Sequence, residues 1–310
     1  MKVKKIALIS LATLGLSSWA NAEILVILPQ TGPMANAADS IKRGIVQVNT
    51  QSSQKYKFKF VNSSNQSLKN ILQRQVNANT ELVIGPLDKK QVEQLIQLKP
   101  KVKVLALNQV QSQINNVYQF ALSKEDDAVA LTQVMKNKGV EELIVLRDKN
   151  SGNQTESFYQ AMKQLWGEKM QDENKLPFFS RKKRGVLVLG SGKWVSEQDL
   201  PKKNIYTLPY AIEENHPVPE GMVFCDTPAL YIQQWSDVIN AYKQKPVSLP
   251  YQRLIAFGGD AWQLADGLLQ QKNAQNVGFN GRTGQLKISQ YTVQRQPQCF
   301  EYHKKGIKSL

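Results

Sequence analysis

The chain has 310 residues, 41% of them hydrophobic and 21% charged, which is ordinary for a globular protein and allows one large or two mid-sized domains. Its formal net charge is +15, and it contains only two cysteines and two histidines. No stretch beyond the first 22 residues is long and apolar enough to cross a bilayer, which excludes an integral helical membrane protein.

The first 22 residues have the pattern of a cleaved export signal. Three lysines precede the apolar run Ile6–Leu16, which is followed by Ala20-Asn21-Ala22, an A-x-A cleavage site. We expect cleavage after Ala22, which leaves a mature chain from Glu23 with a net charge of +12. No cysteine near this site could carry a lipid. The expected location is therefore the periplasm, in soluble form, with peripheral association with the outer membrane as an alternative.

The first part of the mature chain alternates between strand and helix patterns. Ile24–Leu28 predicts a fully apolar strand, and Gln30-Thr31-Gly32-Pro33 turns the chain into an amphipathic helix. A strand with alternating aromatic residues follows over Tyr56–Phe60, and a second helix over Leu68–Val76. This alternation is typical of an α/β fold.

Residues Glu81–Gln109 predict a complete β-α-β unit. An apolar run ends at Gly85-Pro86, an amphipathic helix follows over Lys89–Lys99, and a second apolar run ends at Leu107. Such a unit implies a parallel sheet with helices on its faces. Ligands of open α/β sheets bind beyond the carboxyl ends of strands. The candidate cleft residues at these ends are Thr31, Gly32, Pro86, Asp88 and Asn108.

A second α/β series begins at Ser123, where a serine followed by acidic residues resembles a capping box. A further helix is expected to begin at Asp260, and a glycine-rich turn with flanking β-type residues follows over 278–284. We predict a two-lobed fold in which each lobe is a mainly parallel sheet with helices on both faces. Residues 23–122 plus about 250–310 are assigned to lobe 1, and about 123–249 to lobe 2.

The two cysteines, Cys225 and Cys299, are an even pair in a chain that is expected to reach an oxidising compartment. We predict a disulfide between them, with two separate buried thiols as the alternative. A bond would close a loop of 74 residues.

A run of four basic residues, Arg181, Lys182, Lys183 and Arg184, forms a candidate basic patch. In an exported protein such a patch attracts anionic envelope polymers, lipid headgroups or an acidic partner rather than nucleic acid. It contains no aromatic residue, and a solvated loop is the more economical interpretation.

No catalytic or metal-binding motif is recognisable in the sequence. His216 and His303 have no ligand partner three or four residues away, and the cysteines do not form a CxxC pair. No nucleophile elbow, Walker loop or dinucleotide fingerprint follows a predicted strand. Asp260 is interpreted mainly as a helix N-cap, with a place in a ligand pocket as the alternative. We therefore expect no enzymatic activity, no cofactor and no metal.

Six segments carry a family resemblance: ILVILPQTGPMANAADSIKRGI, ELVIGPLDKKQVEQL, KVLALNQ, YQFALSKEDDAVAL, FGGDAWQLA and FNGRTGQLKI. In this order they resemble the type I periplasmic-binding-protein fold. More closely, they resemble the C-terminal domain of the LppC (LpoA-type) family of penicillin-binding-protein activators. Members of that family also carry a helical N-terminal domain and a lipidated cysteine, and neither matches a segment of this sequence.

The resemblance implies a non-catalytic regulator of peptidoglycan synthesis that binds a class A penicillin-binding protein. The alternative is a periplasmic receptor with a small solute in the interlobe cleft. Amino-acid receptors of this fold carry small hydroxyl residues where this chain has Asp88-Lys89 and Asn108-Gln109. Because Asp88 would repel a carboxylate, amino-acid capture is disfavoured.

Overall fold

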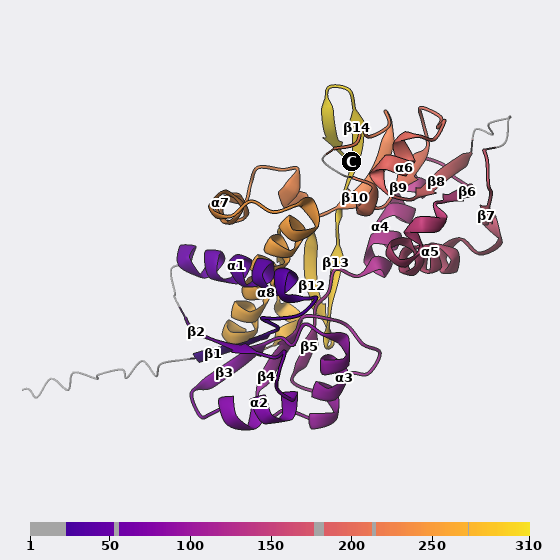
Figure 1. Ribbon diagram of the computed structural model, residues 1–310. Helices are drawn as coiled ribbons and strands as arrows, with labels where there is room; N and C mark the ends of the chain where they lie inside the picture. The colour runs from indigo at the N-terminus through magenta and orange to yellow at the C-terminus, as the bar shows by residue number, and fades with distance from the viewer. Residues whose placement is uncertain (1–22, 53–55, 177–182, 213–214, 272) are drawn as a thin grey trace, which may run out of the picture.

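The computed structural model describes residues 23–52, 56–176, 183–212, 215–271 and 273–310 (Figure 1). Two sheets form the framework. The first has eight strands in the order β11-β12-β13-β5-β4-β3-β1-β2. Its strands from β13 to β2 run parallel, whereas β11 and β12 are antiparallel additions at one edge. The strands are β1 (Glu23–Leu28), β2 (Lys57–Asn62), β3 (Thr80–Ile84), β4 (Lys103–Ala106), β5 (Val117–Gln119), β11 (Gly278–Asn280), β12 (Gln285–Ser289) and β13 (Thr292–Gln296).

The second sheet has seven strands in the order β15-β14-β10-β9-β8-β6-β7. The parallel strands are β10, β9, β8, β6 and β7, and β14 and β15 extend the sheet in antiparallel fashion. The strands are β6 (Glu142–Arg147), β7 (Met170–Asp172), β8 (Arg184–Leu189), β9 (Ile205–Thr207), β10 (Met222–Asp226), β14 (Gln298–His303) and β15 (Gly306–Ser309).

Helices cover both faces of each sheet, as predicted. In the first sheet, alternate residues of β1 point to opposite faces: Ile24 and Val26 pack with α1 and α8, and Leu25 and Ile27 with α2 and α3. In the second sheet, α4 and α5 pack on one face and α6 on the other. The helices are α1 (Ala35–Gln51), α2 (Leu68–Gln75), α3 (Lys89–Leu98), α4 (Lys124–Asn137), α5 (Gly152–Trp166), α6 (Gly192–Ser196), α7 (Ser236–Gln244) and α8 (Leu249–Gln270).

Short 3₁₀ turns connect several of these elements. They are η1 (Lys149–Ser151), η2 (Gly167–Lys169), η3 (Pro209–Ala211), η4 (Pro228–Leu230) and η5 (Ala274–Asn276).

The β-α-β prediction over Glu81–Gln109 is confirmed, since β3 and β4 are parallel and are joined by α3. The expected start of a helix at Asp260 is wrong, because α8 already begins at Leu249 and Asp260 lies in its middle. The misleading signal was Gly258-Gly259. A Cβ on Gly258 would lie 2.0 Å from the carbonyl oxygen of Ile41 in α1. These glycines therefore permit close packing of two helices and do not end one.

The chain passes between the two sheets three times: after β5 into α4, from β10 to α8, and from β13 to β14 (Figure 1). Two segments differ from the expected lobe assignment. Residues 298–309, expected in lobe 1, form β14 and β15 of the second sheet, because β14 pairs with β10. Helix α7, expected in lobe 2, packs on α1 and α8. We therefore propose that lobe 1 comprises residues 23–122 and about 236–297, and that lobe 2 comprises about 123–235 and 298–310.

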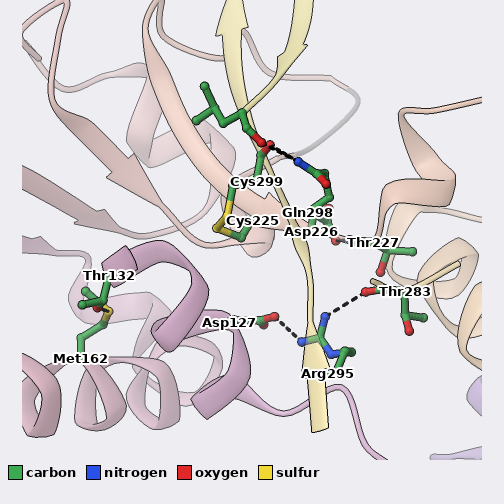
Figure 2. Close-up of a disulfide and its surroundings, with 11 residues drawn as sticks. Asp127, Thr132, Met162, Cys225, Asp226, Thr227, Thr283, Arg295, Gln298 and Cys299 are labelled. Atoms are coloured by element: carbon green, nitrogen blue, oxygen red, sulfur yellow. Dashed lines mark hydrogen bonds and ion pairs between the residues drawn. A yellow bond between two sulfur atoms is a disulfide. The ribbon is translucent and has the colours of Figure 1, made fainter. Parts of the chain in front are cut away.

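The predicted disulfide is present. Cys225 of β10 and Cys299 of β14 are directly opposite each other in the antiparallel pair, and their sulfur atoms are bonded (Figure 2). Both residues are buried, with 2% and 6% of their surface exposed. Over the described ranges, no helix has the length and apolar character needed to cross a membrane.

Candidate functional site

The residues that the sequence suggested for a cleft lie in loops after β1, β3 and β4 and in α8, and several buried charges lie between the two sheets. Thr31 and Gly32 follow β1 and are exposed. The backbone N–H of Thr31 donates to the Ser64 hydroxyl at 3.1 Å, and that hydroxyl donates to the Thr31 carbonyl at 3.1 Å. Gly32 has a φ of +81°, a conformation that a glycine adopts without strain. These two residues shape the turn between β1 and α1.

The other predicted cleft residues of lobe 1 have structural partners. Pro86 is buried and follows a cis peptide bond from Gly85. The Asp88 carboxylate accepts a hydrogen bond from the Gln91 backbone N–H at 3.0 Å and so caps α3. The Asn108 amide donates to the Leu87 carbonyl at 3.1 Å. The side chains of Asp88 and Asn108 therefore organise the loops around them.

Asp260 is fully buried and cannot reach a ligand in a cleft. Its carboxylate accepts hydrogen bonds from the backbone N–H groups of Arg282 and Thr283, from the Thr283 hydroxyl and from the Arg282 guanidinium. Burial raises the pKa of Asp260, and the charge of Arg282 opposes this rise. Arg282 also donates to Asp237 of α7 at 2.6 Å. Asp260 thus holds the turn over 281–284 against α8.

A second buried ion pair connects the lobes directly. Arg253 of α8 donates through Nε and Nη2 to the two carboxylate oxygens of Asp226, at the end of β10, at 2.7 and 2.6 Å. Nη2 also lies 3.2 Å from the Pro209 carbonyl oxygen. Asp226 accepts two further hydrogen bonds, from the Thr227 N–H and the Tyr231 hydroxyl. Burial and the neighbouring Asp226 carboxylate raise the pKa of Tyr231 well above its ordinary value.

A third buried ion pair joins β13 to α4. Arg295 of β13 donates to Asp127 of α4 and, at 3.2 Å, to the carbonyl oxygens of Thr283 and Ser123 (Figure 2). The side chains of Arg295 and Asp127 are 2% and 6% exposed. Burial alone would raise the pKa of Asp127, but the adjacent Arg295 charge holds it below its ordinary value.

These bridges bring together residues from elements far apart in the chain. Two of them, Arg253–Asp226 and Arg295–Asp127, join lobe 1 to lobe 2 through charge-assisted hydrogen bonds in a buried setting. Breaking either would leave an unpaired buried charge, which costs several kcal/mol. Both pairs therefore help to hold the two parts of the chain together. Sequence reasoning missed these pairs because their partners are 27 and 168 residues apart.

The basic patch is described only in part, because Arg181 and Lys182 lie outside the described residues. Lys183 is exposed and pairs with Glu141 at 2.6 Å, and Arg184 pairs with Glu142 at 3.2 Å. Half of the patch is thus neutralised locally. In the described part of the chain, no group of three or more His, Cys, Asp or Glu side chains is arranged to hold a metal ion.

Comparison with known proteins gives a family match. The family model described as "LppC putative lipoprotein" matches residues 6–184. The penicillin-binding protein activator LpoA of Haemophilus ducreyi is 22% identical over 320 residues, which cover 92% of this chain and 54% of that protein. The protein of the same name from Dickeya chrysanthemi is 36% identical over 110 residues, which cover 35% of this chain and 16% of that protein. The chain spans about half the length of the first of these relatives.

Solved structures share the fold. Full-length LpoA from Haemophilus influenzae superposes with a TM-score of 0.78 at 20% identity, over 93% of this chain and 59% of that one. The C-domain of the same protein, described as a regulator of PBP1A, gives 0.74 at 20% identity and is covered to 99%. A putative branched-chain amino acid ABC transporter protein from Chromobacterium violaceum gives 0.73 at 21% identity, over 91% of this chain and all of that one. The two-lobed fold of the periplasmic-binding-protein type is therefore established.

Proposed function

The chain belongs to the LppC family, and we propose that it is a non-catalytic periplasmic regulator of peptidoglycan synthesis that acts by binding a class A penicillin-binding protein. The observation that carries this proposal is the family match together with the name of the relatives, which are penicillin-binding protein activators. The region of similarity to the first relative extends over 92% of this chain, so the whole two-lobed body is the unit that would engage the partner.

The lobe junction supports a role in protein binding over solute capture. Solute receptors of two lobes close around a ligand by a hinge motion. Here the buried Arg253–Asp226 and Arg295–Asp127 bridges connect the two lobes. Asp88 and Asn108, at the strand ends where a solute would bind, are engaged in capping and loop hydrogen bonds. Because these side chains already pair with one another, we propose that the partner is bound by the outer surface of the two lobes.

The expected place of action is the periplasm, after removal of the predicted signal over residues 1–22. The formal net charge of +12 from Glu23 onward would draw the protein toward acidic partners and anionic envelope polymers. We propose no cofactor and no catalytic residue for this function. A fractionation experiment tests the location: the proposal requires recovery with soluble periplasmic proteins or by salt washing of the outer membrane.

The experiment that tests the function measures binding of the purified protein to a purified class A penicillin-binding protein by biolayer interferometry at several salt concentrations. We expect saturable binding that weakens with salt, because screening reduces the contribution of exposed charges. A variant with Lys182→Gln and Lys183→Gln probes the basic patch. A variant with Lys89→Gln and Lys90→Gln removes the same charge from α3 and is the matched control.

A parallel thermal-shift measurement with the standard amino acids tests the receptor alternative. A solute at a hundredfold excess over its Kd would stabilise the fold by about 2.7 kcal/mol. We expect no such stabilisation. A clear shift with any amino acid, together with no binding to the synthase, would overturn the proposal in favour of a receptor.

A further inference from the structure

A groove lies between α4 and the strands β11, β12 and β13. It consists of two cavities of 860 and 670 Å³ that share Ala130, Gln133, Asn280, Gln285 and Gln296 in their walls. Each cavity is within the range of about 300–1,000 Å³ that is usual for pockets that bind small ligands. Because the two are continuous, the groove suits an elongated ligand of several units.

The floor of the groove carries a row of side-chain amides. Asn280 of β11 is opposite Gln285 of β12, which is opposite Gln296 of β13. Neighbouring strands are about 4.8 Å apart, so the three amides repeat at that interval across the sheet. All three residues are exposed, and within the described ranges their side-chain amides have no hydrogen-bond partner. Each offers two donors and one acceptor to a ligand.

The groove is nearly neutral in a strongly basic protein. The Arg295 guanidinium at its edge is neutralised by Asp127. Beyond this pair, the charged side chains in the lining are Lys287 and Asp126, which have opposite signs. A chain of anionic groups would find no cluster of cations here. The groove therefore suits an uncharged ligand.

The groove walls add apolar surfaces to the row of amides. Val129 of α4 is 56% exposed and lines the first cavity. Trp235 and Ile232, both partly exposed, line the second. An indole ring next to amide side chains can contact the C–H face of a sugar ring while the amides bind its hydroxyls. The first cavity exposes more apolar than polar surface, and the second exposes more polar than apolar surface.

We propose that this amide groove binds a neutral glycan chain with N-acetylated sugars. Hydroxyl and acetamido groups both donate and accept hydrogen bonds, as the amides of Gln285 and Gln296 do, and the acetamido methyl groups match the small apolar surfaces. The spacing of the amide row is comparable with the length of one sugar unit in a β-1,4-linked chain. An extended peptide fits less well, because the floor is a sheet face on which the backbone groups of β12 already pair with both neighbouring strands.

Glycan binding by this groove does not require the synthase, so it can be tested with the isolated protein. The outcome of this test is therefore independent of whether the protein binds a penicillin-binding protein. The probe is the soluble β-1,4-linked tetramer of N-acetylglucosamine, titrated by isothermal calorimetry. We expect saturable binding that weakens at least about tenfold in a Gln285→Ala/Gln296→Ala variant, because two hydrogen-bonding groups are removed. Gln94→Ala/Gln97→Ala, which removes two exposed amides from α3, should bind like the unaltered protein.

Two readouts keep the test decisive. Far-UV circular dichroism must show that both variants are folded, as expected for exposed positions. Titration with an uncharged peptide of similar length shows whether the groove prefers a glycan to a peptide. Absence of saturable binding of the tetramer, equal binding by the Gln285→Ala/Gln296→Ala variant, or binding of the peptide in place of the tetramer would each overturn the proposal.

Discussion

Replacing Arg253 by methionine tests whether the lobes are held together by the buried bridge to Asp226. Methionine keeps much of the volume of the side chain and removes its charge. In the variant, Asp226 retains the hydrogen bonds from Thr227 and Tyr231, but its carboxylate, only 2% exposed, loses its counter-ion. Removing one partner of a buried ion pair costs about 3–5 kcal/mol. Because two hydrogen bonds remain, we expect a loss of about 3 kcal/mol in the free energy of unfolding.

The assay is thermal and denaturant unfolding followed by circular dichroism. For a chain of this size, about 3 kcal/mol corresponds to a decrease in melting temperature of about 6–12 °C. The matched control is Lys183→Met, which breaks an ion pair with Glu141 whose side chains are 67% and 60% exposed. Exposed pairs contribute between zero and about 1 kcal/mol, so this variant should unfold close to the unaltered protein.

A double variant, Arg253→Met with Asp226→Asn, completes the cycle. Removing both charges should restore part of the stability, because no unpaired buried charge remains. If Arg253→Met costs no more than Lys183→Met, the bridge does not help to hold the lobes together.

Three further outcomes follow from the packing, the disulfide and the titration of single groups. Gly44→Ala should lower the melting temperature strongly, because its Cβ would lie 2.0 Å from the Ile255 carbonyl oxygen. Gly152→Ala is the control and should leave the melting temperature unchanged, because no atom lies within 4 Å of the new Cβ. Reducing the bond between Cys225 and Cys299, which closes a loop of 74 residues, should lower the free energy of unfolding by up to about 4 kcal/mol, and an unchanged denaturation midpoint would contradict this. Burial raises the pKa of Asp126 to about 6, above its unfolded value of about 4, so the contribution of Asp126 to stability should fall as pH rises from about 4 to about 6. The Asp126→Asn variant should lack that fall and should be more stable than the unaltered protein at neutral pH. Melting temperatures of both proteins measured at each pH make this comparison.

The sequence predicted the parts of the fold that depend on local patterns. The β-α-β unit over Glu81–Gln109 could be recognised because its apolar spacing and its Gly85-Pro86 turn lie close together in the chain. The start of α4 was predicted for the same reason, and the Ser123 hydroxyl indeed accepts a hydrogen bond from the Asp126 N–H. Asp88 could also have been interpreted as a cap, since Gln91 follows three residues later as in a capping box.

The parts that were missed depend on contacts between distant segments. The strand pattern of residues 298–309 is the same whichever sheet it joins, and only the pairing of Cys225 with Cys299 indicated the second sheet. Gly258 looked like a helix boundary because its role, contact with the Ile41 carbonyl of α1, cannot be seen in its neighbours. The bridges of Arg253 and Arg295 likewise have no local signature, since arginine at these positions resembles any surface cation until the fold buries it.

The most direct test of the central claim is the rate at which a purified class A penicillin-binding protein polymerises its lipid-linked precursor, measured with increasing amounts of this protein. We expect a change in initial rate that saturates at the concentrations where the two proteins bind each other, and that persists in the Lys89→Gln/Lys90→Gln control. An unchanged rate at concentrations that saturate binding would contradict the role as a regulator, and an unchanged rate without any binding would contradict the partner as well.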